Sequence, residues 1–293
     1  MIVILGFFLG KKNWIDEHVN KKLINLLLMV AMPCALFTAF PAQFQAESFK
    51  LFLYGLGGGL AVFTTLIIVS RRLFTKKRDR KNFFEYQFAF IFNNATFLGF
   101  PLVSTTFGQP GLVPYAGFII VFNLALFSYG IMLFQQKFDW KHMAQAFINP
   151  NVIAVILGTI FFICSWKLPT FADGSVRYVG ALMTPMSLIC IGYMLSRANL
   201  LKILKKKQTV LTCVAQLTLG PLITFAVLWL LRVPNQALII LVMIQALPTA
   251  TSLGLFAEKY GGDTITASEL VAVSTTMSVV TLPIVMFFVI NLT

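Results

Sequence analysis

Apolar runs alternate with short polar or charged stretches along the whole chain. Charges or clusters of glycine and proline separate ten runs, at residues 2–10, 23–42, 51–70, 84–106, 111–134, 149–166, 176–196, 209–231, 236–257 and 264–290. A transmembrane helix needs about 20 predominantly apolar residues, and all runs but the first come close to that length. The pattern therefore predicts an all-α polytopic membrane protein with ten transmembrane helices, numbered here in chain order as segments 1 to 10.

The composition supports this class. Of the 293 residues, 58% are hydrophobic and 11% are charged, and the mean hydropathy is +0.84. Soluble domains have about 25% charged residues, so these few charges cannot cover the surface of a soluble globule. The four cysteines lie inside apolar runs without a CxxC pair, so neither a disulfide framework nor a cysteine metal site is predicted.

Basic residues are distributed unequally between alternate loops. Of the 23 Lys and Arg residues, 19 lie in one set of loops, and the opposite set holds only Lys50, Lys167, Arg177 and Arg232. Because Lys and Arg gather in cytoplasmic loops, we expect the first set to be cytoplasmic and both termini to be extracytoplasmic. This bias accounts for the net charge of +13, so no nucleic-acid partner is predicted.

Segment 1 is too short to span a bilayer. Its residues MIVILGFFLG extend about 15 Å at a rise of about 1.5 Å per residue, which is about half of the hydrocarbon core. No basic region precedes the apolar part and no small-residue cleavage site follows it, so a signal peptide is not indicated. We expect the native N-terminus to lie upstream of Met1, so that this helix is truncated.

Two pairs of similar motifs occur at nearly the same offset. NATFLGF at 94–100 is similar to TATSLGL at 249–255, 155 residues later, and MPCAL at 32–36 is similar to TPMSL at 184–188, 152 residues later. The shared offset predicts a duplicated five-helix unit. An odd number of helices places the second copy upside down in the membrane, which is an architecture of secondary transporters.

The predicted domain organisation follows from this duplication. It consists of a first repeat at 1–134, a cytoplasmic linker at 135–148 and a second, inverted repeat at 149–293.

Segments 4 and 9 each contain polar residues together with glycine and proline. In inverted-repeat transporters the site lies near the bilayer midplane, where such segments break and expose helix-end dipoles. Pro248 removes a backbone donor and clashes with the preceding turn, so we expect a break there. The predicted substrate-binding residues are Asn93, Asn94, Thr96, Gln245, Thr249 and Thr251, and the predicted crossover or hinge residues are Gly99, Pro101, Pro248 and Gly254. The alternative is that these residues only pack helices together.

Acidic residues and histidines are poorly placed for catalysis. Nearly all of the 10 Asp and Glu residues lie in loops or at segment ends. An intramembrane protease or metalloenzyme needs paired carboxylates or clustered His and acidic residues, so no catalytic residue, metal site or cofactor is predicted. Glu269, about two turns into segment 10, is the one candidate for an acidic coupling group, and the alternative for it is a water-exposed, interfacial position.

The predicted site favours an anionic substrate. Asn, Thr and Gln side chains and helix N-termini stabilise a carboxylate, and without an embedded Lys or Arg the site suits a small organic anion better than a polyphosphate. The chain has no GxxxxGK[ST] phosphate loop, so ATP-driven transport is not predicted.

Four motifs carry a resemblance to a known family. They are FNNATFLGFPL (92–102), NPNVIAVILG (149–158), TPMSLICIGYML (184–195) and IQALPTATSLGLFAEKYGGD (244–263). By these motifs, in this order, the chain resembles the auxin efflux carrier family, whose bacterial members include malate permeases and whose plant members are the PIN auxin exporters. The resemblance covers essentially the whole chain.

The resemblance implies a fold and a mechanism. Segments 1, 2, 6 and 7 would form a scaffold, and segments 3–5 and 8–10 a transport domain that moves as an elevator, in a homodimer. The crossover asparagine of the family corresponds to Asn94, and its second crossover proline to Pro248. Asn93 stands where plant carriers have a proline, and the linker between the repeats has only 14 residues (135–148); both features are those of bacterial members.

The implied function is transport of a malate-like carboxylate across the bacterial cytoplasmic membrane. An auxin-like aromatic acid as substrate and a non-transporting membrane sensor or scaffold remain alternatives. The coupling ion, with a co-transported proton among the options, and the direction of transport stay open.

Overall fold

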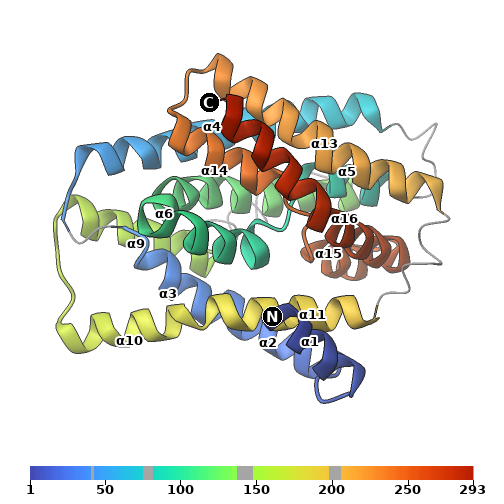
Figure 1. Cartoon of the computed structure of the whole chain (residues 1–293), viewed down its shortest axis with the longest axis horizontal. Helices are drawn as coiled ribbons and strands as arrows, with labels where there is room; N and C mark the ends of the chain where they lie inside the picture. The colour runs from blue at the N-terminus through green and yellow to red at the C-terminus, as the bar shows by residue number, and fades with distance from the viewer. Residues whose placement is uncertain (41–42, 75–81, 137–147, 198–205, 293) are drawn as a thin grey trace. The chain divides into compact units, whose positions relative to one another are not determined.

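The structure is a computed structural model that describes residues 1–40, 43–74, 82–136, 148–197 and 206–292 (Figure 1). Every regular element in these ranges is a helix, accompanied by one isolated β-bridge, so the predicted all-α class is confirmed. Most of the predicted cytoplasmic linker and many of the basic loop residues lie outside the described residues.

The helices have the following bounds, with η for π-helical turns: α1 (Ile2–Lys11), α2 (Glu17–Leu26), η1 (Leu27–Ala31), α3 (Met32–Phe37), α4 (Ala46–Leu73), α5 (Phe83–Ile91), η2 (Ala95–Gly99), α6 (Phe100–Ala125), η3 (Leu126–Gly130), α7 (Ile131–Gln135), α9 (Pro150–Ile163), α10 (Thr170–Ala181), α11 (Met183–Arg197), α13 (Lys207–Leu230), α14 (Asn235–Gln245), α15 (Ser252–Tyr260) and α16 (Thr264–Leu292).

Within the described ranges, six helical stretches are long and apolar enough to cross a membrane. They are Glu17–Phe37, Ala46–Leu73, Ala95–Gln135, Thr170–Arg197, Lys207–Leu230 and Thr264–Leu292, and shorter apolar helices occupy Ile2–Lys11, Pro150–Ile163 and Asn235–Gln245. The 41-residue stretch has a kink at Gly108 (φ 61°, ψ −153°), which lies between the predicted segments 4 and 5. The predicted ten-helix inverted repeat remains a prediction.

Two helices begin earlier than their apolar runs. Helix α2 begins at Glu17, because the Asp16 carboxylate accepts the backbone N–H of Val19 (2.8 Å) and caps the helix. Helix α10 begins at Thr170, and its polar first turns hold an ion pair between Arg177 and Asp173 (2.8 Å). In both cases pairing and capping allow a charged turn to extend an apolar helix, which hydropathy alone does not detect.

The chain forms two compact units. Unit 1 contains Met1–Leu56, Thr96–Ile120 and Phe147–Ala198, and unit 2 contains Gly57–Ala95, Val121–Ala146 and Asn199–Thr293. Each unit therefore combines parts of both predicted repeats.

In unit 1, α1 packs closely along α11 (Figure 1). A β-carbon on Gly6 would overlap the carbonyl oxygen of Ile189, and one on Gly192 would overlap the carbonyl oxygen of Val3. Glycine at these two positions lets the two backbones touch, as small residues do between membrane helices.

Replacing Gly192 by alanine tests this contact. We expect Gly192→Ala to lower the thermal unfolding temperature of the purified protein, because the methyl group forces α1 away from α11. The matched control is Gly174→Ala on α10, where a β-carbon meets nothing within 4 Å; there alanine should raise stability by about 0.5–1 kcal/mol through its higher helix propensity. Equal unfolding temperatures for the two variants would contradict the close helix contact.

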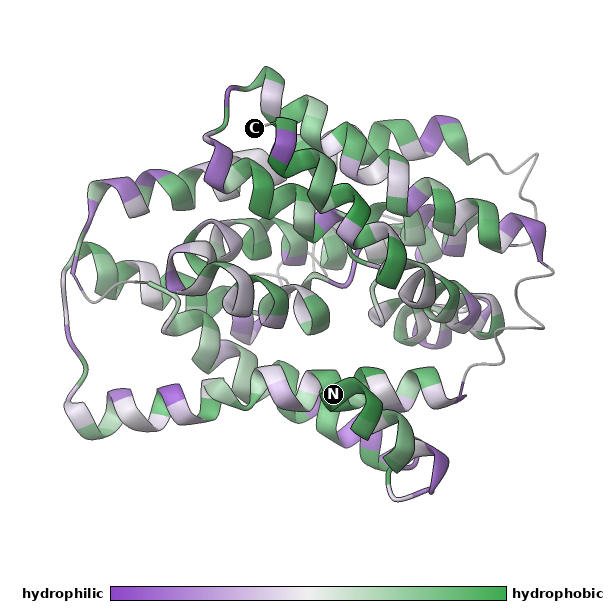
Figure 2. Ribbon diagram, viewed as in Figure 1, coloured by the Kyte–Doolittle hydropathy of each residue, from purple (hydrophilic) through white to green (hydrophobic). Residues whose placement is uncertain are grey.

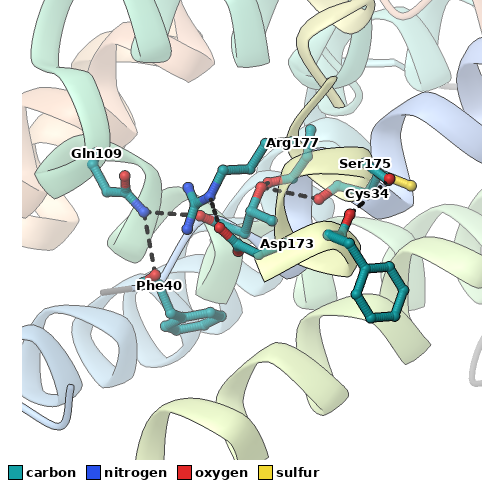
Figure 3. Close-up of polar contacts among 9 residues, drawn as sticks. Cys34, Phe40, Gln109, Asp173, Ser175 and Arg177 are labelled. Atoms are coloured by element: carbon teal, nitrogen blue, oxygen red, sulfur yellow. Dashed lines mark hydrogen bonds and ion pairs between the residues drawn. The ribbon is translucent and has the colours of Figure 1, made fainter. Parts of the chain in front are cut away.

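The C-terminal end of α3 in unit 1 is held by polar contacts (Figure 3). The side-chain amide of Gln109, directly after the Gly108 kink, donates to the carbonyl oxygens of Thr38 (2.8 Å) and Phe40 (3.2 Å). The Thr38 hydroxyl in turn donates to the Cys34 carbonyl (3.0 Å). The two bonds from Gln109 supply partners for carbonyl groups at the end of the helix and just beyond it.

In unit 2, α13 packs against α5, α14 and α16. Apolar side chains on α13 and α16 are also exposed, among them Leu222 (63%), Val279 (71%) and Phe287 (66%), and hydrophobic colours dominate α16 in Figure 2. Exposed apolar residues on long helices fit contact with lipid acyl chains rather than water.

Candidate functional site

Unit 2 contains two interruptions of helical structure. Helix α5 ends at Ile91 and helical structure resumes at Ala95, while α14 ends at Gln245 and α15 begins at Ser252. These interruptions lie inside the predicted segments 4 and 9, and Pro248 stands in the second one. Each break leaves backbone groups without helical partners, and in a membrane such groups must find partners within the protein.

The two interruptions pair with each other. Asn93 and Thr249 form an antiparallel β-bridge, in which the Asn94 N–H donates to the Pro248 carbonyl (2.6 Å) and the Ala250 N–H donates to the Phe92 carbonyl (2.9 Å). Pro248 has no backbone N–H that would need a partner in the bridge. Its carbonyl oxygen accepts the N–H of Asn94 from the other interruption. The bridge thus replaces helical hydrogen bonds that both breaks remove.

Side chains from three helices converge on the bridge. The Asn93 amide donates to Gln245 Oε1 (2.8 Å), and both side chains are fully buried. From α13, the Gln216 amide donates to the Leu247 carbonyl (2.6 Å), and from α16 the Ser274 hydroxyl accepts the Thr249 N–H (3.0 Å).

Gln216 and Ser274 are missing from the residues predicted by sequence. The available signal was a polar side chain in the middle of an otherwise apolar span. That signal is weak, because single Gln and Ser residues in such spans also serve simply to join helices.

Four buried polar atoms at the bridge have no hydrogen-bond partner in the described structure. They are Asn93 Oδ1, Gln216 Oε1, Gln245 Nε2 and Thr249 Oγ1, and we call these four residues the crossover cluster. Leaving a buried donor or acceptor unsatisfied costs about 1–3 kcal/mol, and native proteins rarely do so. Four such atoms at one bridge therefore indicate a place for a polar ligand or for water.

The crossover cluster is electrically neutral and offers both donors and acceptors. Rotating a side-chain amide exchanges the positions of its oxygen and nitrogen. The amide still offers one hydrogen-bond acceptor and one donor group after the rotation. The C-terminal ends of α5 and α14 and the N-terminal end of α15 adjoin the bridge, so partial charges of both signs lie nearby. The arrangement can hold a small molecule with hydrogen-bonding groups of both kinds.

Aromatic side chains surround the residue next to Asn93. The Phe92 ring lies 4.7 Å from the Phe88 ring, 5.9 Å from that of Phe63 and 6.2 Å from that of Phe122, measured between centroids. These rings make the surroundings of the bridge apolar, which strengthens any hydrogen bond formed there.

The other predicted site residues lie in different environments. Asn94 and Pro248 are buried at the bridge, whereas Thr251, the N-cap of α15, and Gly254 are half-buried. A β-carbon on Gly254 meets nothing within 4 Å. A separate group, Thr96, Gly99 and Pro101, belongs to unit 1. The roles predicted for all of them remain predictions.

Glu269 lies near the start of α16, where Lys206 donates to its Oε1 at 2.6 Å. This hydrogen bond raises the pKa of the Lys206 ammonium above its usual value. The Glu269 side chain is 12% exposed, so the carboxylate is an ion-pair partner at the start of the helix.

Comparison of the sequence with known proteins identifies the family of this chain. Residues 1–286 match the family described as "Membrane transport protein". The chain is 24% identical over 292 residues to an uncharacterized transporter of Methanothermobacter thermautotrophicus, covering 97% of this chain and 94% of the relative. It is also 23% identical over 124 residues to auxin efflux carrier component 8 of Arabidopsis thaliana, covering 41% of this chain and 34% of that protein.

These matches confirm the resemblance seen in the four motifs. The chain belongs to the membrane transport protein family and is a membrane transporter of the auxin efflux carrier type.

Proposed function

We propose that this protein is a secondary active transporter that moves a small organic anion, a malate-like carboxylate, across the bacterial cytoplasmic membrane. The observation that carries the proposal is the crossover cluster, in which four buried polar atoms lack partners at the bridge between two broken helices. Inverted-repeat transporters bind substrate at such broken helices. The protein is proposed to act as a carrier without catalytic chemistry or a cofactor.

The donors and acceptors of the crossover cluster suit a hydroxycarboxylate. The Gln245 amide and the Thr249 hydroxyl can donate to a carboxylate, while Asn93 Oδ1 and Gln216 Oε1 can accept from a hydroxyl group. The N-terminus of α15 adds partial positive charge for the anion. Since the cluster holds no fixed charge, an anion binds by hydrogen bonds and can leave again, as a carrier requires.

An elevator motion is the proposed mechanism. Unit 2 contains the crossover cluster together with α13, α14, α15 and α16, while α1–α3 and α9–α11 belong to unit 1. A division into two compact units supports a mechanism in which one body carries the site past another. A homodimer and extracytoplasmic termini are part of the same proposal, by family resemblance and by loop charge.

An aromatic carboxylate is the second candidate substrate. The rings of Phe63, Phe88 and Phe122 around Phe92 are the observation that favours it, and one relative is named as an auxin efflux carrier component. Malate and indole-acetate therefore need to be compared directly.

Uptake into proteoliposomes tests the proposed function. We expect purified protein to take up labelled malate saturably without ATP, and unlabelled malate to compete better than citrate, lactate or indole-acetate. Stronger competition by indole-acetate would favour the aromatic substrate. If folded protein takes up none of the four compounds in labelled form, the sensor or scaffold alternative gains support over the proposal.

A further inference from the structure

Glu85 is the most deeply buried acidic side chain among the described residues, with 2% of its surface exposed. It lies in the first turn of α5, the helix that leads to the bridge. Its Oε1 accepts the backbone N–H of Asp263 at 2.6 Å, while its Oε2 is buried without a partner. This burial was not predictable from the hydropathy pattern, since Glu85 stands at the edge of an apolar run.

The turn between α15 and α16 is shaped around this carboxyl group. Gly261 adopts φ 80° and ends α15, and a β-carbon on Gly262 would lie 2.6 Å from Glu85 Oε1 and 2.7 Å from the Phe134 ring. A side chain at 262 would therefore displace the Glu85 carboxyl group or the Phe134 ring from these positions. The Glu85 carboxyl group therefore joins the start of α5 to the end of α15, the two elements that flank the bridge.

Opposing effects act on the charge of Glu85. The Asp263 N–H and the N-terminal dipole of α5 stabilise the carboxylate. Burial and the nearby Asp263 carboxylate destabilise it. Among the described residues Asp263 is the charged group that acts on Glu85. Other titratable side chains on or next to the elements around α5 are Arg71, Tyr86, Tyr129, Lys206, Lys207, Cys213, Glu258, Lys259, Tyr260 and Glu269.

Glu269 differs from Glu85 in having an ammonium partner, Lys206. Glu269 Oε2 is also buried without a partner, but the other oxygen of that carboxylate binds the Lys206 ammonium. The charged group near Glu85 is instead another carboxylate, that of Asp263, and this arrangement favours uptake of a proton at Glu85.

We propose that Glu85 is a proton-binding site whose protonation state controls how firmly the turn between α15 and α16 is held to α5. A proton from water binds at Oε2 and neutralises the carboxylate, and it returns to water when it leaves. Neutralisation weakens the hydrogen bond from the Asp263 N–H, because bonds to charged acceptors are the stronger ones. The inference rests on the proposed transport function in one respect, because it makes proton binding at Glu85 the step that couples a proton gradient to substrate transport.

Infrared difference spectroscopy of the membrane-reconstituted protein at varied pH tests the proton site without any substrate. We expect a carbonyl band of a protonated carboxylic acid that titrates in wild type and is lost in Glu85→Gln. Glutamine keeps an oxygen for the Asp263 N–H, so the fold should persist. The band should remain in Glu269→Gln and in Glu47→Gln, whose parent side chain is exposed and paired with Lys50.

A second variant keeps the test decisive should glutamine at 85 prevent folding. Asp263→Asn retains a side chain that caps α16, as Asp263 Oδ1 does by accepting the Ile265 N–H (3.0 Å). It removes a neighbouring negative charge, so the titration of the band should shift to lower pH. An unchanged band in Glu85→Gln, loss of the band in Glu269→Gln instead, or no shift in Asp263→Asn would overturn the proposal.

Transport then tests the coupling separately. In wild type, an inward proton gradient should accelerate malate uptake, and in Glu85→Gln the uptake rate should no longer depend on the gradient. If the infrared band behaves as expected but no substrate is transported, the proton site stands and the proposed transport function fails. If uptake in Glu85→Gln responds to the gradient as in wild type, the coupling role of Glu85 is wrong while transport stands.

Discussion

Thr249→Val is expected to remove most substrate binding while leaving the protein at least as stable as wild type. The Thr249 hydroxyl is buried and has no partner in the described structure, so valine deletes an unsatisfied group of nearly the same shape. Removing it should leave the free energy of unfolding unchanged or raise it by about 1 kcal/mol. The backbone N–H of Thr249 still donates to Ser274, so the bridge is retained.

The loss of binding follows from the proposed role of the hydroxyl. A hydrogen bond to a charged group contributes about 1.5–3 kcal/mol, which corresponds to about a 10- to 150-fold weaker affinity for the carboxylate. The measurements are labelled malate binding and thermal unfolding of the purified protein. Thr224→Val is the matched control, because the buried Thr224 hydroxyl already donates to the Gly220 carbonyl (2.9 Å).

The opposite result for Thr249→Val, in binding and in stability, would assign the Thr249 hydroxyl a structural role. A variant that binds malate like wild type but unfolds more easily would show that the hydroxyl supports the fold. In that case the unpartnered oxygen would hold a structural water and not the substrate.

The pair Asn93 and Gln245 should show the second large effect. Asn93→Ala or Gln245→Met leaves the other amide buried without its 2.8 Å partner, so each single change should lower the free energy of unfolding by about 1–3 kcal/mol. Uptake should be lost in both variants, because each change also removes an unpartnered atom of the crossover cluster.

A double-mutant cycle separates the pair from its surroundings. The double variant should be destabilised by about 1 kcal/mol less than the sum of the single variants, because both ends of one hydrogen bond are then absent. Its uptake should remain lost. Strict additivity of the two stability changes would mean that the amides do not interact, and uptake by the double variant would remove both residues from the site.

The residues at the bridge were predictable because they break a strong pattern. Amides and proline inside apolar runs are costly in a membrane, and they mark Asn93, Gln245 and Pro248 in the sequence. The pairing of Asn93 with Thr249 was not predictable, since it depends on how two distant breaks meet in space.

Other features lacked any sequence signal of this kind. Gln216 is one polar residue in an apolar helix, a pattern equally typical of simple helix packing. Glu85 stands at the edge of an apolar run, and its burial depends on a glycine turn far along the chain, at Gly262. The early starts of α2 and α10 depend on capping and ion pairing, which a hydropathy pattern does not include.

Counterflow tests most directly whether the protein is a carrier with one alternating site at the bridge. Proteoliposomes are loaded with unlabelled malate and diluted into a trace of labelled malate. The account predicts rapid, transient accumulation of label in wild type and none in Asn94→Ala, whose parent side chain is buried at the bridge. Uptake that internal malate does not stimulate, or equal counterflow in folded Asn94→Ala protein, would contradict it.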